Sequence, residues 1–346
     1  PPGVSAPAIG AASSVTAVIA GALTTGGSTN DTDLKVRVSL ATTNAVAGDT
    51  IQLYNASTAL GTAYTLSAAD ITNRYADVPT GTLTNGSTYT INAKVIDIAG
   101  NASSASANFI TTVDTSAPAA ALITSISTNP GDPNTSDTII NDSSPAITFT
   151  GEAGATVQVL DPGGNAVPSS SYTLQRFGTT YILNTGTNTQ ADGVYSIKLI
   201  DASGNISSPA TFTIDTTAPG APAITDVTDD VGSITGALTT GGRTNDTNLT
   251  VRVSLATTNA VAGNTIQLYN ASTALGSAYT LLAADITTGY ADVATGTLSN
   301  GTSYSINAKV IDRAGNASTA SATFTTTVDT TAPLSLIHIS EPTRPY

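Results

Sequence analysis

The chain has 346 residues, of which 40% are hydrophobic and 10% are charged, and its formal net charge is −13. An acidic surface with few lysines and arginines argues against binding to nucleic acid or to anionic membranes. The absence of cysteine excludes disulfides and thiol chemistry, and no apolar run approaches the roughly 18 residues of a membrane-spanning helix.

An Asp-Thr-(Ser/Thr)-Ala-Pro segment occurs three times, at 114–118, 215–219 and 329–333. Each copy follows a run that is typical of a strand, and its proline cannot donate to a β-ladder. The segments therefore predict the ends of three successive repeats. We call residues 1–115 repeat one, 116–217 repeat two and 218–333 repeat three. Repeats one and three are near copies, with 17 differences over the 95 aligned positions 21–115 and 236–330, whereas repeat two is diverged.

The predicted elements of repeat one are short strands separated by turns. Alternation is strictest at 34–40, where Leu34, Val36, Val38 and Leu40 are expected to face the core. This pattern of about seven short strands predicts an all-β fold, a tandem array of three immunoglobulin-like antiparallel β-sandwiches. In chain order, we predict strands at 15–23, 34–40, 50–54, 63–66, 76–83, 89–97 and 105–113, with a turn at 24–31 and one helical turn at 68–71.

A tyrosine follows a glycine turn at the start of the penultimate predicted strand. Tyr89 follows Gly86, Tyr304 follows Gly301, and repeat two keeps part of the pattern at Tyr195. This placement resembles the tyrosine corner of immunoglobulin-like sandwiches, in which the hydroxyl bonds to nearby backbone.

Each repeat also contains an Asp-x-(Ala/Ser)-Gly-Asn turn before its last strand, at 97–101, 201–205 and 312–316. Together with the Asp-Thr-(Ser/Thr)-Ala-Pro segments, these turns resemble bacterial immunoglobulin-like repeats of large surface adhesins and biofilm-associated proteins. The resemblance covers residues 1–333. It implies a stalk or extender segment on the bacterial cell surface or outside the cell. The implied partners are neighbouring repeats of the same chain, with host or biofilm surfaces bound through other domains.

Residues 334–346 have no counterpart in the repeats and resemble a translated sequencing adapter. We expect this tail, which contains the only histidine, to be non-native and disordered, and we assign it no function. The start of the chain in what reads as a linker suggests a fragment of a longer protein.

Strand direction predicts that acidic residues of successive repeats meet. In a seven-stranded sandwich, the turn after the first strand and the end of the last strand share one end, while the turn before the last strand lies at the other. A linker of a few residues would then bring the end of one repeat to the start of the next. The first junction would contain Asp31, Asp114, Asp201 and Asn205, the second Asp142, Asp215, Asp312 and Asn316, and a third Asp246 and Asp329.

Converging carboxylates repel one another unless a cation lies among them. All-oxygen ligand sets suit calcium, which accepts irregular shells of 6–8 oxygens, whereas the lack of histidine and cysteine in the repeats disfavours transition metals. The resemblance implies calcium at repeat junctions as well. The alternative is that these residues form stable turns without any ion.

Two other function classes remain open from the sequence. The repeats lack the residues of Ser/His/Asp and Cys/His catalysis, so no enzyme is expected, although paired carboxylates are not excluded. A glycan- or protein-binding module is one alternative, and accessory domains of a secreted polysaccharide-active enzyme are another. Tyr64, Tyr75 and Tyr290 could form a sugar platform but are expected to pack on the sandwich. We interpret Asp70, Asp77, Asp285 and Asp292 as solvated loop residues.

Overall fold

The structure is a computed structural model that describes residues 5–13, 22–127, 138–233 and 235–332. Its contacts divide the chain into two compact units. One unit contains residues 1–126, 146–186 and 194–211, and the other contains residues 127–145, 187–193 and 212–346. Each junction analysed below lies within one of these units.

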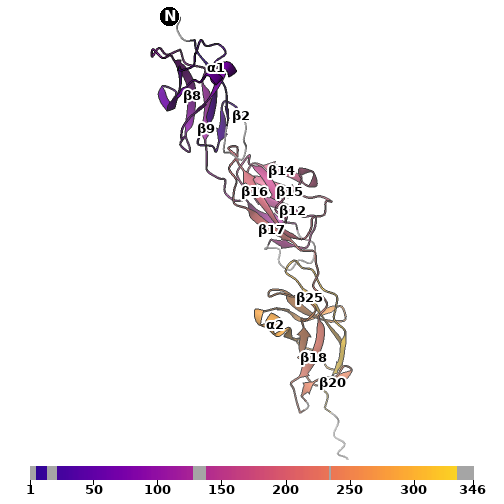
Figure 1. Cartoon of the computed structure of the whole chain (residues 1–346). Helices are drawn as coiled ribbons and strands as arrows, with labels where there is room; N and C mark the ends of the chain where they lie inside the picture. Colours follow the sequence, from indigo (N-terminus) through magenta and orange to yellow (C-terminus); the bar gives the residue numbers. More distant parts are fainter. Residues whose placement is uncertain (1–4, 14–21, 128–137, 234, 333–346) are drawn as a thin grey trace, which may run out of the picture. The chain divides into compact units, whose positions relative to one another are not determined.

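Repeat one contains two sheets, with strand orders β2-β1-β4-β7 and β3-β9-β8-β5-β6, and one short helix (Figure 1). The predicted strands from residue 34 onward are confirmed, as is the helical turn. The elements are β1 (Ala8–Ser13), β2 (Ala22–Leu23), β3 (Gly27–Thr29), β4 (Lys35–Ser39), β5 (Thr50–Asn55), β6 (Thr58–Thr65), α1 (Ala68–Asn73), β7 (Tyr75–Pro79), β8 (Thr88–Ile96) and β9 (Phe109–Val113).

The predicted core face of β4 is confirmed. Leu34, Val36 and Val38 are fully buried and Leu40 nearly so, because successive side chains of a strand point to opposite faces. Val36, Val38 and Leu40 pack with alternating residues of β5 and β8, such as Leu53 from the opposite sheet, whereas Leu34 packs with Leu83 and Val113. The two-residue period thus determines which face of each sheet becomes core.

The start of repeat one differs from the prediction. The structure places the first strand, β1, at Ala8–Ser13, where it pairs with β4. Most of the predicted strand 15–23 lies outside the described residues. Within the predicted turn at 24–31, Gly27–Thr29 forms β3, which pairs in parallel with β9. The segment is short and polar, so it has no apolar alternation from which a strand could be predicted.

Repeat two has the same kind of architecture with shorter sheets. One sheet has the order β10-β12-β15-β14. In addition, β13 pairs antiparallel with β16, and β11 pairs in parallel with β17. The elements are β10 (Leu122–Ile126), β11 (Ile139–Ile140), β12 (Ala146–Thr150), β13 (Thr156–Leu160), a 3-10 turn at Ser169–Ser171, β14 (Thr173–Phe177), β15 (Thr180–Asn184), β16 (Gly193–Ile200) and β17 (Ala210–Ile214).

Repeat three reproduces repeat one, with sheets β19-β18-β21-β24 and β20-β26-β25-β22-β23. Its elements are β18 (Ala223–Asp229), β19 (Gly236–Ala237), β20 (Gly242–Thr244), β21 (Thr250–Ser254), β22 (Thr265–Asn270), β23 (Thr273–Thr280), α2 (Ala283–Thr288), β24 (Tyr290–Ala294), β25 (Ser303–Ile311) and β26 (Phe324–Val328).

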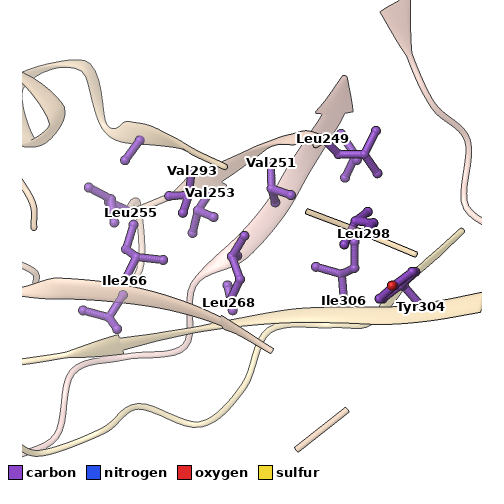
Figure 2. Close-up of a cluster of buried hydrophobic side chains, with 14 of the residues drawn as sticks. Leu249, Val251, Val253, Leu255, Ile266, Leu268, Val293, Leu298, Tyr304 and Ile306 are labelled. Atoms are coloured by element: carbon purple, nitrogen blue, oxygen red, sulfur yellow. The ribbon is translucent and has the colours of Figure 1, made fainter. Parts of the chain in front are cut away.

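The core of repeat three lies between its two sheets. Figure 2 shows Val251 and Val253 of β21 on one side, with Ile266, Leu268 and Ile306 of the other sheet facing them. All five side chains are fully buried. The described chain is therefore all-β apart from two short helices and one 3-10 turn, and it forms tandem immunoglobulin-like sandwiches as predicted.

The tyrosine corners of repeats one and three are present. The backbone N–H of Thr84 donates to Tyr89 Oη at 2.8 Å, and that of Ser299 donates to Tyr304 Oη at 2.7 Å. In both repeats the bonded N–H lies five residues before the tyrosine. Each bond fixes the loop that leads into the penultimate strand. Tyr195 of repeat two is also buried.

We expect Tyr304→Phe to lower the free energy of unfolding of repeat three by about 1 kcal/mol, because the Ser299 N–H loses its acceptor near the core. Chemical denaturation followed by amide exchange on β25 would measure this change. Tyr290→Phe is the control, since the same hydroxyl is removed from a partly exposed ring on another strand. An equal loss in both variants would contradict a specific role for the corner.

Candidate junction sites between repeats

The Asp-x-x-Gly-Asn turn has one hydrogen-bond pattern in all three repeats. The aspartate Oδ1 accepts from the backbone N–H of the asparagine, and its Oδ2 accepts from the asparagine Nδ2. In repeat one, for example, both distances from Asn101 to Asp97 are 2.8 Å. These are the local turn bonds that aspartate commonly forms, and the turn alternative expects them as well.

Sequence reasoning missed a fourth turn of this kind. Asp161 and Asn165 of repeat two form the same backbone bond at 2.8 Å, with longer side-chain contacts of 3.4 Å. In its sequence, Asp-Pro-Gly-Gly-Asn, the aspartate and the asparagine are four residues apart, as in the other three turns. This spacing alone could have revealed the turn.

At the first junction, the turn of repeat two contacts the end of repeat one. Asn205 Nδ2 donates to the backbone carbonyl of Asp114 at 2.8 Å, while the same nitrogen also donates to Asp201. The backbone N–H of Asn30 donates to the Ser203 carbonyl at 3.1 Å. Asp201 and Asn205 are only 9% and 8% exposed. The turn is thus buried by the preceding repeat.

The second junction repeats this contact. Asn316 Nδ2 donates to the backbone carbonyl of Asp215 at 2.7 Å and to Asp312 Oδ2 at 2.9 Å. The pKa of Asp312 is raised, chiefly because the carboxyl is buried, and the negative charge of Asp215 raises it further. The two carboxylates that the sequence placed at this junction are therefore near enough to repel each other.

The third set of predicted residues lies at the end of repeat three. Asp246 is buried, and the backbone N–H of Asp329 donates to the Thr244 carbonyl at 2.8 Å. The carboxylate of Asp329 pairs with exposed Arg243 at 3.4 Å. Repeat one has Ser28 at the position of Arg243, so this ion pair is particular to repeat three.

The remaining predicted aspartates cap loops. The carboxylate Oδ1 of Asp31, Asp142 and Asp246 accepts the backbone N–H two residues later, at 2.9, 2.7 and 2.7 Å. This is a local turn bond of the kind that aspartate commonly forms. Asp31 follows Asn30, whose N–H donates to Ser203 at the first junction, and Asp142 and Asn141 follow Ile140, whose carbonyl accepts from the Asp215 N–H at 2.8 Å.

Three asparagines in the described part of the chain, Asn30, Asn141 and Asn307, have a buried side-chain oxygen without a hydrogen-bond partner. Asn307 lies within β25, whereas the other two, Asn30 and Asn141, lie in loops and were not considered in the sequence analysis. Each of these two directly precedes one of the capping aspartates, and Asn245 of repeat three is their exposed counterpart. The Asn-Asp pair in all three repeats was the signal that could have identified them.

The structure does not by itself define a metal centre. Among the described residues there is no group of three or more His, Cys, Asp or Glu side chains that could hold a metal ion. The predicted calcium sites therefore stay a prediction, and the residues that could supply them are the junction oxygens described above.

A further contact holds each linker to its own repeat. Asn85 Oδ1 accepts from the Thr115 N–H, and Asn300 Oδ1 accepts from the Thr330 N–H, both at 2.8 Å. Repeat two has Asp192 at this position. Its carboxylate accepts from both linker hydroxyls at 2.7 Å, and these hydroxyls, Thr217 first and then Thr216, lower the pKa of Asp192.

The exposed-tyrosine platform finds little support. The guanidinium of Arg37 lies 4.1 Å from the centre of the Tyr75 ring, and that of Arg252 lies 4.2 Å from the Tyr290 ring. The Tyr64 hydroxyl donates to Asp70. The three tyrosines therefore interact with side chains of their own sandwich, two of them through cation–π contacts.

The interpretation of four aspartates as loop residues was wrong, although the side chains of Asp77 and Asp292 are partly solvated, at 39% and 41% exposure. Asp77 and Asp292 lie on strands and pair with arginines, each through two hydrogen bonds of 2.8 Å. Asp70 and Asp285 accept the N–H at the start of α1 and α2. Two of these carboxylates thus form ion pairs with arginine, and the other two cap a helix. A single sequence does not reveal these partners.

The class that the fold defines is a tandem immunoglobulin-like β-sandwich array. No family model matches the chain, and no curated protein matches it. No helix in the described ranges is long and apolar enough to cross a membrane.

Several solved structures resemble the chain at low identity. An E-to-A variant of titin domains I67–I69 has 9% identity and a TM-score of 0.34, over 88% of this chain and 94% of that one. A Ca²⁺-stabilized adhesin that helps an Antarctic bacterium bind ice has 19% identity and a TM-score of 0.29, over 86% and 69%. A 1.5-MDa bacterial ice-binding adhesin has 17% identity and a TM-score of 0.26, over 86% and 90%. Scores this low carry no argument about what the present chain binds or does.

Proposed function

We propose that this chain is a structural extender segment of a bacterial surface adhesin, not an enzyme, and that it acts outside the cell. One observation carries the proposal: the same asparagine contact joins successive repeats at both junctions. Asn205 donates to the Asp114 carbonyl and Asn316 donates to the Asp215 carbonyl. In both cases the acceptor is the first residue after the last strand of a repeat, and a contact repeated in this way suits a chain that holds successive repeats together.

The repeat surfaces agree with this role. Repeats one and three are near copies, so neither has an aromatic patch that the other lacks, and the partly exposed tyrosines Tyr75 and Tyr290 lie under arginines in both. The partners of the segment are then its neighbouring repeats. Adhesion to host or biofilm surfaces would belong to other domains.

Calcium at the junctions is the second part of the proposal. Hard cations take oxygen ligands from carboxylates, amides and backbone carbonyls, and the unpaired Asn30 and Asn141 oxygens are ligands of this kind. Asp31 and Asp142 lie next to them in sequence, and Asp215 raises the pKa of Asp312 by repulsion that a cation would relieve. These residues would hold the ion, which would supply positive charge and reduce movement between repeats.

We expect millimolar calcium to raise the Tm of residues 1–333 by several degrees relative to a chelator. A ligand at 100 times its Kd stabilises the folded state by about 2.7 kcal/mol. Calorimetry with calcium, magnesium and chelator would measure the shift, and small-angle scattering would report the accompanying change in length. Asn30→Ala and Asn141→Ala should each reduce the response.

Asn245→Ala is the matched control, because this exposed asparagine has the same sequence context without a following repeat in the structure. An unchanged Tm and an unchanged scattering profile would remove calcium from the proposal and leave the turns as purely hydrogen-bonded structures. The extender function itself would be contradicted by free rotation between repeats two and three, measured as independent tumbling by NMR relaxation.

A further inference from the structure

The turn of repeat one has the same fold as the other two junction turns but no covering partner in the described structure. Asp97 and Asn101 form the shared bonds at 2.8 Å, yet Asn101 is exposed and Ile98 is 77% exposed. The next residue, Ala99, is also exposed, whereas the corresponding Ala314 of repeat three is 0% exposed; Arg313, the counterpart of Ile98, is exposed. The difference lies in what covers the turn, since the turn itself is unchanged.

Repeat three shows what covers such a turn. A hollow of about 420 Å³ is lined on one side by the end of repeat two, including Asp215, Thr217 and Pro219. Its other side is formed by the turn and the neighbouring loop of repeat three, including Val261 and Asp312. The strand end, the Thr-Ala-Pro linker and the turn therefore form one interface.

Repeat one keeps the receiving half of this interface. Val46, Asp97 and Asn101 occupy the positions of Val261, Asp312 and Asn316. The larger change is Ile98 for Arg313, which leaves an apolar side chain at an exposed tip. Val46 and Val261 are both 56% exposed, so this valine keeps the same exposure at the formed junction and in repeat one.

The incoming linker is also shared. Ala6-Pro7-Ala8-Ile9 matches Ala221-Pro222-Ala223-Ile224. The Thr257 hydroxyl donates to the Ala221 carbonyl at 2.9 Å, and the Thr42 hydroxyl donates to the Ala6 carbonyl at 3.5 Å. The chain thus enters repeat one along the path by which it enters repeat three.

We propose that the surface formed by Val46, Asp97, Ile98 and Asn101 receives the C-terminal end of another sandwich repeat. The occupant is a strand end followed by Asp-Thr-(Ser/Thr)-Ala-Pro. Its aspartate carbonyl accepts from Asn101 Nδ2, and docking buries Ala99 as Ala314 is buried in repeat three. The inference rests on the proposed extender function but does not depend on calcium.

The inference can be tested on a lengthened protein. A second copy of residues 116–220 is placed directly before Ala6, so that a copy of repeat two precedes repeat one in the same way as repeat two precedes repeat three. The chain has no cysteine, so Ala99→Cys introduces a single thiol whose labelling rate by a maleimide reports exposure of the turn. We expect labelling to be at least about tenfold slower in the extended chain, and Asn101→Ala to restore the faster rate; tenfold corresponds to about 1.4 kcal/mol.

The controls separate this inference from the proposed function. Ala314→Cys in the original chain reports the existing second junction, because Ala314 is 0% exposed there, and amide-exchange protection of the Ile197–Leu199 strand in both copies shows that the added copy is folded. Equal labelling of the Ala99→Cys variant in both chains, with the thiol of the Ala314→Cys variant protected, overturns the inference alone. Fast labelling of the Ala314→Cys variant would instead count against the extender function. Concentration-dependent protection of the Ala99→Cys thiol in the original chain would assign the surface to a second copy and would overturn the proposal.

Discussion

Asp201→Ala should lower the free energy of unfolding of repeat two by about 2–4 kcal/mol. The Asp201 carboxylate accepts the N–H groups of Ser203 and Asn205 and the Asn205 side chain, at 2.8, 2.9 and 2.8 Å. All three residues are buried at the first junction. Removing their acceptor leaves several buried donors without a partner, and each costs about 1–3 kcal/mol, only partly recovered by relaxation. Native-state amide exchange on β13 and β16 would measure the change.

The matched variant is Asp97→Ala, which breaks the same bonds in the exposed turn of repeat one. Water can replace the lost acceptor there, so we expect a loss of about 1 kcal/mol or less. The comparison isolates burial by the neighbouring repeat, because the hydrogen-bond pattern is the same in both turns. Equal losses in the two variants would mean that the first junction is not formed in solution.

Phe149→Ala should lower the free energy of unfolding of repeat two by about 3–5 kcal/mol. Phe149 is fully buried on β12, and its ring stacks on Tyr181 with centroids 5.2 Å apart and planes 4° from parallel. The variant loses both the apolar contact and the stacking. Denaturant unfolding of the full chain, followed by exchange on β12 and β15, would assign the loss to repeat two.

Phe149→Val is the informative control. By strand pairing, Val38 and Val253 occupy the corresponding places in repeats one and three. We expect Phe149→Val to cost less than Phe149→Ala, since fewer atoms are removed, yet to be destabilising because Tyr181 remains to be packed. A neutral Phe149→Ala would contradict the burial of this ring pair inside repeat two.

The strands that could be predicted were those with apolar alternation. The segment 34–40 is the clearest case, because a one-residue error in register would turn Leu34, Val36 and Val38 to the solvent. β3, with the sequence Gly-Ser-Thr, has no such pattern. Its position follows from pairing with β9, a contact across more than 80 residues that local sequence does not encode.

The candidate junctions could be predicted in outline but not in chemistry. Counting strand directions placed Asp114 with Asn205 and Asp215 with Asn316, and hydrogen bonds join both pairs. The sequence did not reveal that the carbonyl of each aspartate accepts the bond, or that the carboxylate of Asp201 is already bonded within its own turn. Which oxygen accepts which hydrogen bond depends on distances between side chains in the folded protein. The spacing of residues along the chain does not determine these distances.

The parallel pairing of β3 with β9 determines how a repeat would respond to tension. A pull on the two ends of repeat one acts backward along Gly27–Thr29 and forward along Phe109–Val113, so the bonds between these strands bear the load together in shear. An antiparallel pair pulled apart at its open end would instead lose its bonds one after another. β20 and β26 repeat the arrangement. Because the junction carbonyl of Asp114 directly follows β9, the strand that bears the load is also the strand that docks the next repeat.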